Sequence, residues 1–196
     1  MRNLEPKPVA QRYERQTPGD LIHIDVKKLA RFRKVGHRIT GNRQQGRSTG
    51  VGYDRVHVAI DDATRLAYVE VLADEQQATA IGFLSRSVAW FNGQGVECHQ
   101  VMSDNGSAYI SKAFAKACSV LKLKHIRTRP YTPRTNGKAE RFIQTRCKEW
   151  AYAMPFQNSQ ERNAWLPRYL SIYNRIRKHS ALGSRSPQQR LNELLC

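Results

Sequence analysis

Cysteine is scarce in this sequence, and no stretch of it stays apolar for long. The four cysteines lie at positions 98, 118, 147 and 196 and include no C-x-x-C pair. This spacing argues against a zinc cluster or a disulfide framework, so we expect reduced thiols, three of them packed in the core. No apolar run approaches the roughly 20 residues that a membrane-spanning helix needs. The N-terminus also lacks the apolar stretch of a signal peptide. We therefore expect a cytoplasmic protein with no membrane partner.

Acidic residues are also few. The chain has 16 Asp and Glu against 33 Lys and Arg, which gives a formal net charge of +17. Hydrophobic residues make up 40% of its 196 positions, enough for the core of one folded domain. A folded domain this basic usually binds a polyanion, so the charge predicts a nucleic-acid partner. An anionic membrane surface is the weaker alternative.

Composition divides the chain into three parts. Residues 1–18 are polar, with prolines at 6, 8 and 18, and are predicted to form a linker or an N-terminal arm. Residues 19–175 contain the predicted core, interrupted at 27–52 by a basic, glycine-containing stretch that we expect to be a long loop or an irregular hairpin tip. Residues 176–196 are expected to form a basic C-terminal tail.

Hydrophobic periodicity predicts a mixed α/β fold. Strands are predicted at about 21–26, 56–60, 66–72, 100–103 and 124–126. The first three are joined by turn-forming segments and should form an antiparallel meander. Helices are predicted at about 74–92, 111–121, 136–150 and 159–174. Crossovers through these helices place the last two strands parallel to the first, in a five-stranded mixed sheet with helices on both faces. The first and fourth strands are then neighbours, and sites form beyond strand ends at such places.

Three acidic residues stand out by their position. Asp25 interrupts an apolar strand, which is a costly place for a carboxylate. Asp104 follows the fourth strand, and Glu140 lies near the start of a helix. Three clustered carboxylates repel one another unless cations neutralise them, and such oxygen ligands suit Mg²⁺ or Mn²⁺. Two ions about 3.5–4 Å apart would activate an attacking oxygen and stabilise the leaving one.

Each of these acids also has a structural interpretation, and spacing does not decide between the two. Asp104 begins an Asp-Asn-Gly sequence that is typical of a turn. Glu140 suits the N-terminal end of a helix, and Asp25 would fit a buried salt bridge. Asp61 and Asp62 are rival metal ligands, but their position in a predicted hairpin favours a role in the turn.

Four segments in order resemble a known family. They are Gly19–Asp25, Ser103–Gly106, Tyr131–Phe142 and Tyr173–Leu182, the last followed by Ser186-Pro187. With 35 residues between Asp104 and Glu140, the sequence resembles the integrase-like DDE transposases of bacterial insertion sequences. These enzymes share their core fold with retroviral integrases. The resemblance extends from about residue 18 to residue 194.

The resemblance implies a ribonuclease H-like fold in which Asp25, Asp104 and Glu140 bind the metal and carry catalysis. It implies strand cleavage by water, followed by attack of the freed 3′-hydroxyl on target DNA. The expected cofactor is Mg²⁺, for which Mn²⁺ can substitute, with two ions per site when DNA is bound. The alternatives are a metal-dependent nuclease of the same fold and a DNA-binding fragment that is catalytically incomplete.

The resemblance also implies the partners. We expect the element ends and the target DNA to be held by a homodimer or a higher assembly, at the bacterial nucleoid. Such transposases usually carry an N-terminal helix-turn-helix region that reads the element ends. This sequence shows no such region, so we do not expect the chain alone to select the end sequence.

Two basic segments are predicted to contact DNA phosphates. The first surrounds Glu140 and comprises Arg134, Asn136, Lys138 and Arg141. The second lies in the predicted loop and comprises Arg31, Arg33, Lys34, Arg38, Arg43 and Arg47. His23 and Asn105 are candidates for hydrogen bonds to the metal ligands, although a packed strand histidine is the preferred interpretation of His23. His179, in the predicted tail, is either a DNA contact or an ordinary surface residue.

Overall fold

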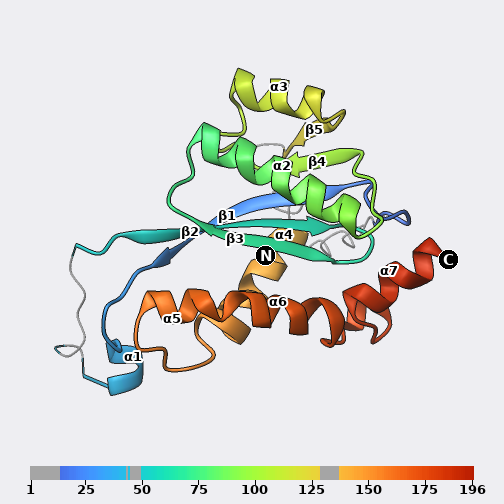
Figure 1. Cartoon of the computed structure of the whole chain (residues 1–196). Coiled ribbons are helices and arrows are strands. Elements are labelled where there is room, and N and C mark those ends of the chain that lie inside the picture. The colour runs from blue at the N-terminus through green and yellow to red at the C-terminus, as the bar shows by residue number, and fades with distance from the viewer. Residues whose placement is uncertain (1–13, 43, 45–49, 129–136) are drawn as a thin grey trace, which may run out of the picture.

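A single five-stranded sheet organises the chain (Figure 1). The computed structural model describes residues 14–42, 44, 50–128 and 137–196. The strands are β1 (Ile22–Ala30), β2 (Tyr53–Asp61), β3 (Ala67–Leu72), β4 (Gln100–Ser103) and β5 (Lys124–Arg127), and their order in the sheet is β3-β2-β1-β4-β5. The pairs β1–β2 and β2–β3 are antiparallel, whereas β1–β4 and β4–β5 are parallel. The predicted strand arrangement is therefore confirmed.

Helices cover both faces of this sheet. They are α1 (His37–Thr40), α2 (Gln77–Gly93), α3 (Lys112–Val120), α4 (Gly137–Arg146), α5 (Ser159–Ala164), α6 (Leu166–Arg175) and α7 (Pro187–Leu195). A π-helical turn, η1 (Cys147–Ala151), continues α4, and a 3₁₀ turn, η2 (Ser180–Leu182), precedes α7. Figure 1 shows α2 and α3 on one side of the sheet and α4, α5 and α6 on the other.

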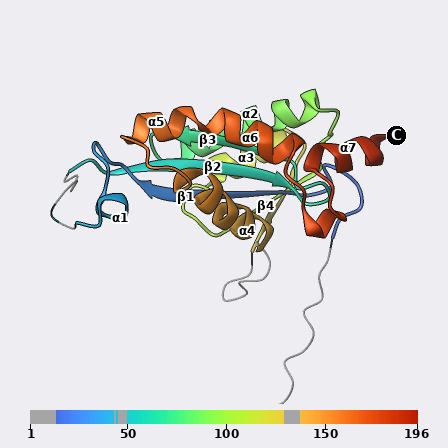
Figure 2. The same ribbon diagram turned by 90° about the horizontal axis from the view of Figure 1, so that it is seen from below.

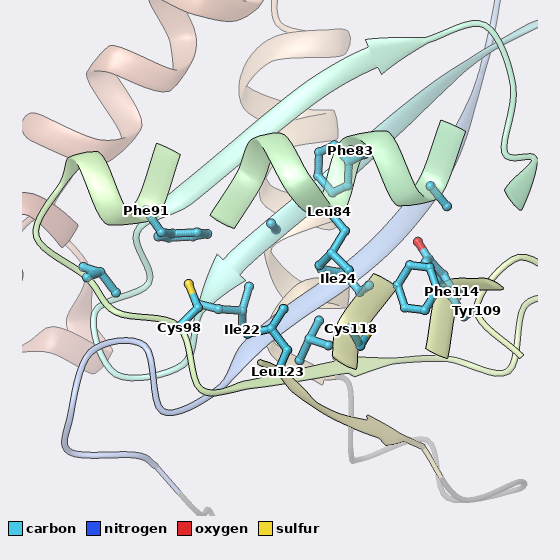
Figure 3. Packing of buried hydrophobic residues seen from close by; sticks show 14 of the residues in the cluster. Ile22, Ile24, Phe83, Leu84, Phe91, Cys98, Tyr109, Phe114, Cys118 and Leu123 are labelled. Atoms are coloured by element: carbon cyan, nitrogen blue, oxygen red, sulfur yellow. The ribbon is translucent and has the colours of Figure 1, made fainter. Parts of the chain in front are cut away.

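Two hydrophobic clusters lie on the two faces. The first joins Ile22 and Ile24 of β1 to Phe83 and Phe91 of α2 and to side chains of α3 (Figure 3). The second joins the opposite face of β2 to α4, η1 and α6. Side chains alternate along a strand, so the odd-numbered residues of β1 point to the second face. Asp25 is one of these, and its partner Val58 on β2 belongs to the second cluster.

The basic segment 27–52, here called the basic arm, is more regular at its start than predicted. β1 continues through Ala30 and pairs with the beginning of β2, so that Leu29 lies opposite Asp54. Leu29 is only 1% exposed, and its burial explains why the strand does not stop after Asp25. Figure 1 shows this two-stranded ribbon running past the rest of the sheet toward α1. The predicted start of the loop at residue 27 was four residues too early, and the pairing of β1 with β2 agrees with the hairpin alternative.

The prediction of a C-terminal tail at 176–196 was also wrong. Ser186 forms a capping box with Gln189, and Pro187 occupies the first turn of α7. Leu191 then inserts into the first hydrophobic cluster with 0% of its surface exposed. Basic composition suggested a tail, but one buried leucine and a strong helix start are enough to pack this segment.

All four cysteines are free thiols, as predicted. Cys98 and Cys118 are buried, half-buried Cys147 packs against the second cluster and Cys196 is exposed, which agrees with the three expected core thiols. In the part of the chain that the structure describes, no helix combines the length and apolarity needed to cross a membrane.

Candidate catalytic site

The parallel pair β1–β4 brings Asp25 and Asp104 together. Its register aligns Ile22 with Val101 and His23 with Met102. The same register continued by two residues places Asp25 level with Asp104, the first residue after β4. Strand pairing stops at this level, so the two carboxylates lie where β4 ends. The prediction that the first and fourth strands are neighbours in the sheet is confirmed.

Backbone amides hold one oxygen of each carboxylate. The Val26 N–H donates to Asp25 Oδ1 over 2.7 Å, and the Gly106 N–H donates to Asp104 Oδ1 over 2.9 Å. A Cβ atom at Gly106 would lie 3.0 Å from Asp104 Oδ1. Any side chain at position 106 would therefore crowd the carboxylate, which explains the Asp-Asn-Gly sequence here. The turn interpretation of Asp104 is compatible with a functional one, because the turn fixes the side chain.

Asn105 tightens the same loop without touching the acids. Its Nδ2 donates to the Thr128 carbonyl over 2.8 Å, and the Thr128 N–H donates to the Ser103 carbonyl over 3.0 Å. These bonds fasten the end of β4 to the end of β5. Among the described residues Asn105 makes no hydrogen bond to Asp25 or Asp104, so its candidate role beside the metal ligands stays a prediction.

Glu140 approaches from the second face of the sheet. It lies in the first turn of α4 with an exposed side chain, two residues before the buried Phe142. α4 packs against β1 and β2, and Figure 2 shows it lying across β1. The π-helical turn that follows buries Trp150, whose Nε1 donates to the Arg162 carbonyl over 2.7 Å. This packing fixes the helix that carries Glu140.

The three acids share one electrostatic environment. Burial is the main cause that raises the pKa of Asp25 to about 6, and the charges of Asp104 and Glu140 raise it further. The Val26 N–H and the Lys27 cation oppose this shift. The mutual repulsion is what a divalent cation would relieve, and three carboxylates are the donor set that Mg²⁺ prefers. The donor chemistry therefore fits a magnesium site.

The fold does not by itself close these acids into a metal cage. Among the residues that the structure describes, no three His, Cys, Asp or Glu side chains are close enough to hold an ion. Asp25 and Asp104 are fixed by strand register, whereas Glu140 is placed by α4, whose first residue follows directly on 129–136, outside the described residues. The acids nevertheless lie within electrostatic range of one another.

His23 of β1 is paired with an acid of the turn between β2 and β3. It is buried, and its Nε2 lies 2.8 Å from Asp62 Oδ1. Asp61 Oδ2 accepts hydrogen bonds from the Thr64 N–H and hydroxyl, at 2.8 and 2.6 Å. The preferred interpretations, a packed strand histidine and two acids that form the hairpin turn, are confirmed. The candidate role of His23 beside the metal ligands stays a prediction.

The predicted DNA-contact residues are only partly described. Arg33 and Lys34 of the basic arm and Arg141 of α4 are exposed. Arg38 lies in α1 and Lys138 in α4, and only their backbone is described. The remaining candidates, Arg43, Arg47, Arg134 and Asn136, fall outside the described residues.

Arg31 is held at the base of the arm by a network that sequence reasoning missed. Its Nε donates to Asp54 Oδ1 over 2.7 Å, while Arg162 Nη2 and Asn163 Nδ2 donate to Asp54 Oδ2 over 2.6 and 3.0 Å. Burial raises the pKa of Asp54, but the bonds from Asn163 and Arg31 and the charge of Arg162 outweigh it and lower that pKa below its usual value. Arg162 is 1% exposed. The network ties the arm to α5.

His179 is a packing residue and not a surface cation. Its ring meets that of Tyr173 edge-on at 4.8 Å. Burial, together with the charge of Arg177, lowers the pKa of His179 to about 4, so the ring is neutral at pH 7. Of its two interpretations, a charged DNA contact is the one that the structure opposes.

The sheet order β3-β2-β1-β4-β5, with helices on both faces, defines the class of fold as ribonuclease H-like. An integrase core domain model matches residues 15–133, and a second integrase core domain model matches residues 121–187. Because the first covers more than half of the chain, the chain belongs to the integrase core domain family. The family resemblance predicted from the sequence is confirmed.

Sequence relatives are transposases of insertion elements. The transposase InsD for insertion element IS2A/D/F/H/I/K of Escherichia coli is 32% identical over 95 residues, which are 48% of this chain and 32% of that protein. The InsD transposase for the IS2 element on the F plasmid of E. coli K12 matches with the same identity and coverage. The chain thus spans about a third of the length of these relatives.

Solved integrase structures share the fold. A chain of the simian T-cell lymphotropic virus intasome in complex with PP2A regulatory subunit B56 gamma aligns with a TM-score of 0.68 and 19% identity, covering 91% of this chain and 56% of that one. The catalytic core domain of BIV integrase aligns with a TM-score of 0.61 and 16% identity, over 89% of this chain and 95% of that one. The HTLV-2 integrase catalytic core domain in complex with magnesium gives 0.60 and 15%, over 89% and 97%. The predicted ribonuclease H-like fold is confirmed.

Proposed function

We propose that this chain is the catalytic core of an insertion-element transposase, which cleaves DNA strands and joins the freed 3′ ends to target DNA. The observation that carries the proposal is the alignment of Asp25 with Asp104 across β1 and β4. The charge of Glu140, which lies on α4, also raises the pKa of Asp25. Membership of the integrase core domain family and the transposase relatives support the same reaction.

Asp25, Asp104 and Glu140 are proposed to bind Mg²⁺, with Mn²⁺ as a substitute and two ions per site when DNA is present. Bound ions would supply the electrostatic stabilisation that phosphoryl transfer needs at its attacking and leaving oxygens. The chain's own contribution is to fix two carboxylates rigidly, through Val26 and Gly106, and to present the third on a helix. One protein of similar fold, the HTLV-2 integrase catalytic core domain, is known in complex with magnesium.

DNA is the proposed substrate, both as element ends and as target. The net charge of +17 supports binding to a polyanion. The exposed Arg33, Lys34 and Arg141 are proposed phosphate contacts. The other predicted contacts are kept in the proposal: Arg31, Arg38, Arg43, Arg47, Arg134, Asn136 and Lys138. Because two ends must be joined in one event, a homodimer or higher assembly on DNA in the bacterial cytoplasm is part of the proposal. One similar structure is that of an intasome.

The experiment that tests this function is strand transfer of a labelled DNA end into a plasmid, with Mg²⁺ or Mn²⁺. Wild type, Glu140→Gln and Glu97→Gln are compared, the last being a control at an exposed acid in the loop between α2 and β4. We expect a metal-dependent joined product from wild type and the control, and none from Glu140→Gln. Cleavage without joining would favour the nuclease alternative. DNA binding without any reaction would favour a catalytically incomplete fragment.

A further inference from the structure

A cavity lies where the basic arm passes α5 (Figure 1). Its volume is about 470 Å³, which is within the range of cavities that bind small organic groups. Arg31, Phe32 and Arg33 of the arm line it, and so do Asn158 and Gln160 at the start of α5. The cavity therefore combines cations, an aromatic ring and carboxamides.

Part of the cavity wall is held rigid by hydrogen bonds within the protein. Arg162 and Asn163 donate to Asp54 Oδ2 over 2.6 and 3.0 Å, while the arm occupies Oδ1. The Phe32 N–H donates to the Ser159 hydroxyl over 2.7 Å, and the Ser159 N–H donates to the Phe32 carbonyl over 3.0 Å. The wall is thus preformed, and the one carboxylate in it is already neutralised by its partners.

Other groups that line the cavity keep hydrogen-bonding capacity in the described part of the chain. The side-chain amide of Gln160 makes no hydrogen bond there, and Asn158 uses only its Oδ1, which accepts the Glu161 N–H over 2.9 Å. Arg31 donates to Asp54 through Nε, and 42% of its side chain is exposed. Two carboxamides and a guanidinium can therefore still bind a ligand.

This set of groups suits a nucleotide. Arginine binds phosphate, and an aromatic ring such as that of Phe32 can stack on a base. A carboxamide such as that of Gln160 can pair with the N6 and N7 atoms of adenine. A base inside a duplex cannot enter a cavity, so the nucleotide has to be unpaired or extruded from the helix.

We propose that the cavity between the arm and α5 binds one unpaired nucleotide of DNA, with its phosphate at the two arginines and its base at Phe32 and Gln160. Adenine is the preferred base, because Gln160 can form two hydrogen bonds with it. The inference rests on the proposed function, since it takes DNA as the substrate.

The position of the cavity allows one DNA molecule to occupy both it and the candidate catalytic site. The Arg31 N–H donates to the Gly52 carbonyl over 3.0 Å, so the alternation of β1 continues and places Arg31 on the same face as Asp25 and Leu29. Six residues of extended chain from Asp25 to Arg31 span about 20 Å. For a duplex that runs parallel to β1, this distance corresponds to about six base pairs.

The test compares two DNA duplexes of equal length, one fully paired and one with a central A·C mismatch. Both carry the same number of phosphates, so the salt-dependent phosphate contribution cancels and a difference in Kd reports the unpaired base. Binding is measured in chelator, so that no strand is cut. We expect wild type to bind the mismatched duplex about tenfold tighter than the paired one, since a mismatch lowers the cost of extrusion.

Gln160→Leu removes the carboxamide from an exposed position and keeps a side chain of similar size. Loss of a bidentate pair with a base costs about 1–3 kcal/mol, so this variant should bind the two duplexes almost equally. Gln77→Leu is the matched control, an exposed glutamine at the first residue of α2 on the other face of the sheet. It should keep the preference of wild type.

Equal affinity of wild type for the two duplexes would overturn the nucleotide site but leave the proposed function standing, because DNA is still bound. The site would also be overturned if Gln160→Leu kept the preference, or if Gln77→Leu lost it. Failure of wild type to bind either duplex would instead refute the proposed function. Deoxyadenosine monophosphate tests the other source of the same chemistry. If isothermal titration shows it to bind more tightly than the mismatched duplex, the ligand is a free nucleotide and the assignment to DNA is wrong.

Discussion

The side-chain amide of Asn174 forms hydrogen bonds with both the N–H and the carbonyl of Ala67. Its Oδ1 accepts the Ala67 N–H over 3.0 Å, and its Nδ2 donates to the Ala67 carbonyl over 2.9 Å. β3 is an edge strand of the sheet, so α6 here supplies the pairing that a further strand would give. The Tyr-Asn pair at 173–174 carried part of the family resemblance, and at Asn174 its role in this chain is to seal a sheet edge.

Replacing Asn174 by alanine should therefore act on stability and not on DNA affinity. The substitution leaves a buried N–H and a buried carbonyl of Ala67 without their partners, which costs about 3 kcal/mol. Urea unfolding would measure the loss, and DNA binding below the transition should be unchanged. Asn192→Ala removes an exposed amide from α7 and serves as the control, with an expected change below about 0.5 kcal/mol. Weaker DNA binding by folded Asn174→Ala would contradict this assignment.

Asp25 makes the stability of the metal-free protein depend on pH. Its pKa is about 6 in the folded protein and near 3.8 when unperturbed, so the folded state binds the proton more tightly than the unfolded state does. Stability should rise as pH falls from 7 to 5, by about 1 kcal/mol. Chelator-treated protein unfolded in urea at both pH values would measure this gain.

Asp25→Asn is the companion variant for that measurement. It removes the titrating group and its repulsion from Asp104 and Glu140, so it should be more stable than wild type at pH 7 and show little of the gain between pH 7 and 5. If the stability of the wild-type protein instead falls steadily as the pH is lowered from 7 to 5, the assignment of repulsion to these three acids is refuted.

The sequence was sufficient for the sheet order and for the pairing of Asp25 with Asp104. Alternating apolar residues, turn signals and the handedness of crossovers left one place for the fourth strand, which is beside the first. It was not sufficient for the Asp54–Arg162 pair, whose members are 108 residues apart and lie in segments that look like ordinary polar surface. Burial that depends on tertiary contacts leaves no local pattern in the amino-acid sequence.

The exposed basic residues of the arm should contribute to DNA affinity through phosphate contacts alone. Replacing both Arg33 and Lys34 by alanine is expected to weaken binding to all DNA sequences alike. The slope of log affinity against log salt concentration should fall by about 0.9 for each phosphate contact that is lost. Lys116→Ala, at an exposed position on α3, is the control. An unchanged salt slope in the double variant would remove the arm from the DNA-binding surface.

Catalysis and DNA binding should separate at Asp104. Asparagine in its place keeps the acceptor for the Gly106 N–H, so the loop after β4 retains its shape, but it removes a negative charge that repels phosphate. Asp104→Asn is therefore expected to abolish cleavage while DNA binding is unchanged or tighter. Arg141→Ala, which removes an exposed cation next to Glu140, should instead weaken DNA binding. It should reduce cleavage only in proportion to the fraction of protein that has DNA bound. Binding titrations and single-turnover cleavage at saturating DNA distinguish the two effects. Equal loss of DNA binding in both variants would mean that Asp104 supports the binding surface, and the division between metal ligands and phosphate contacts would fail.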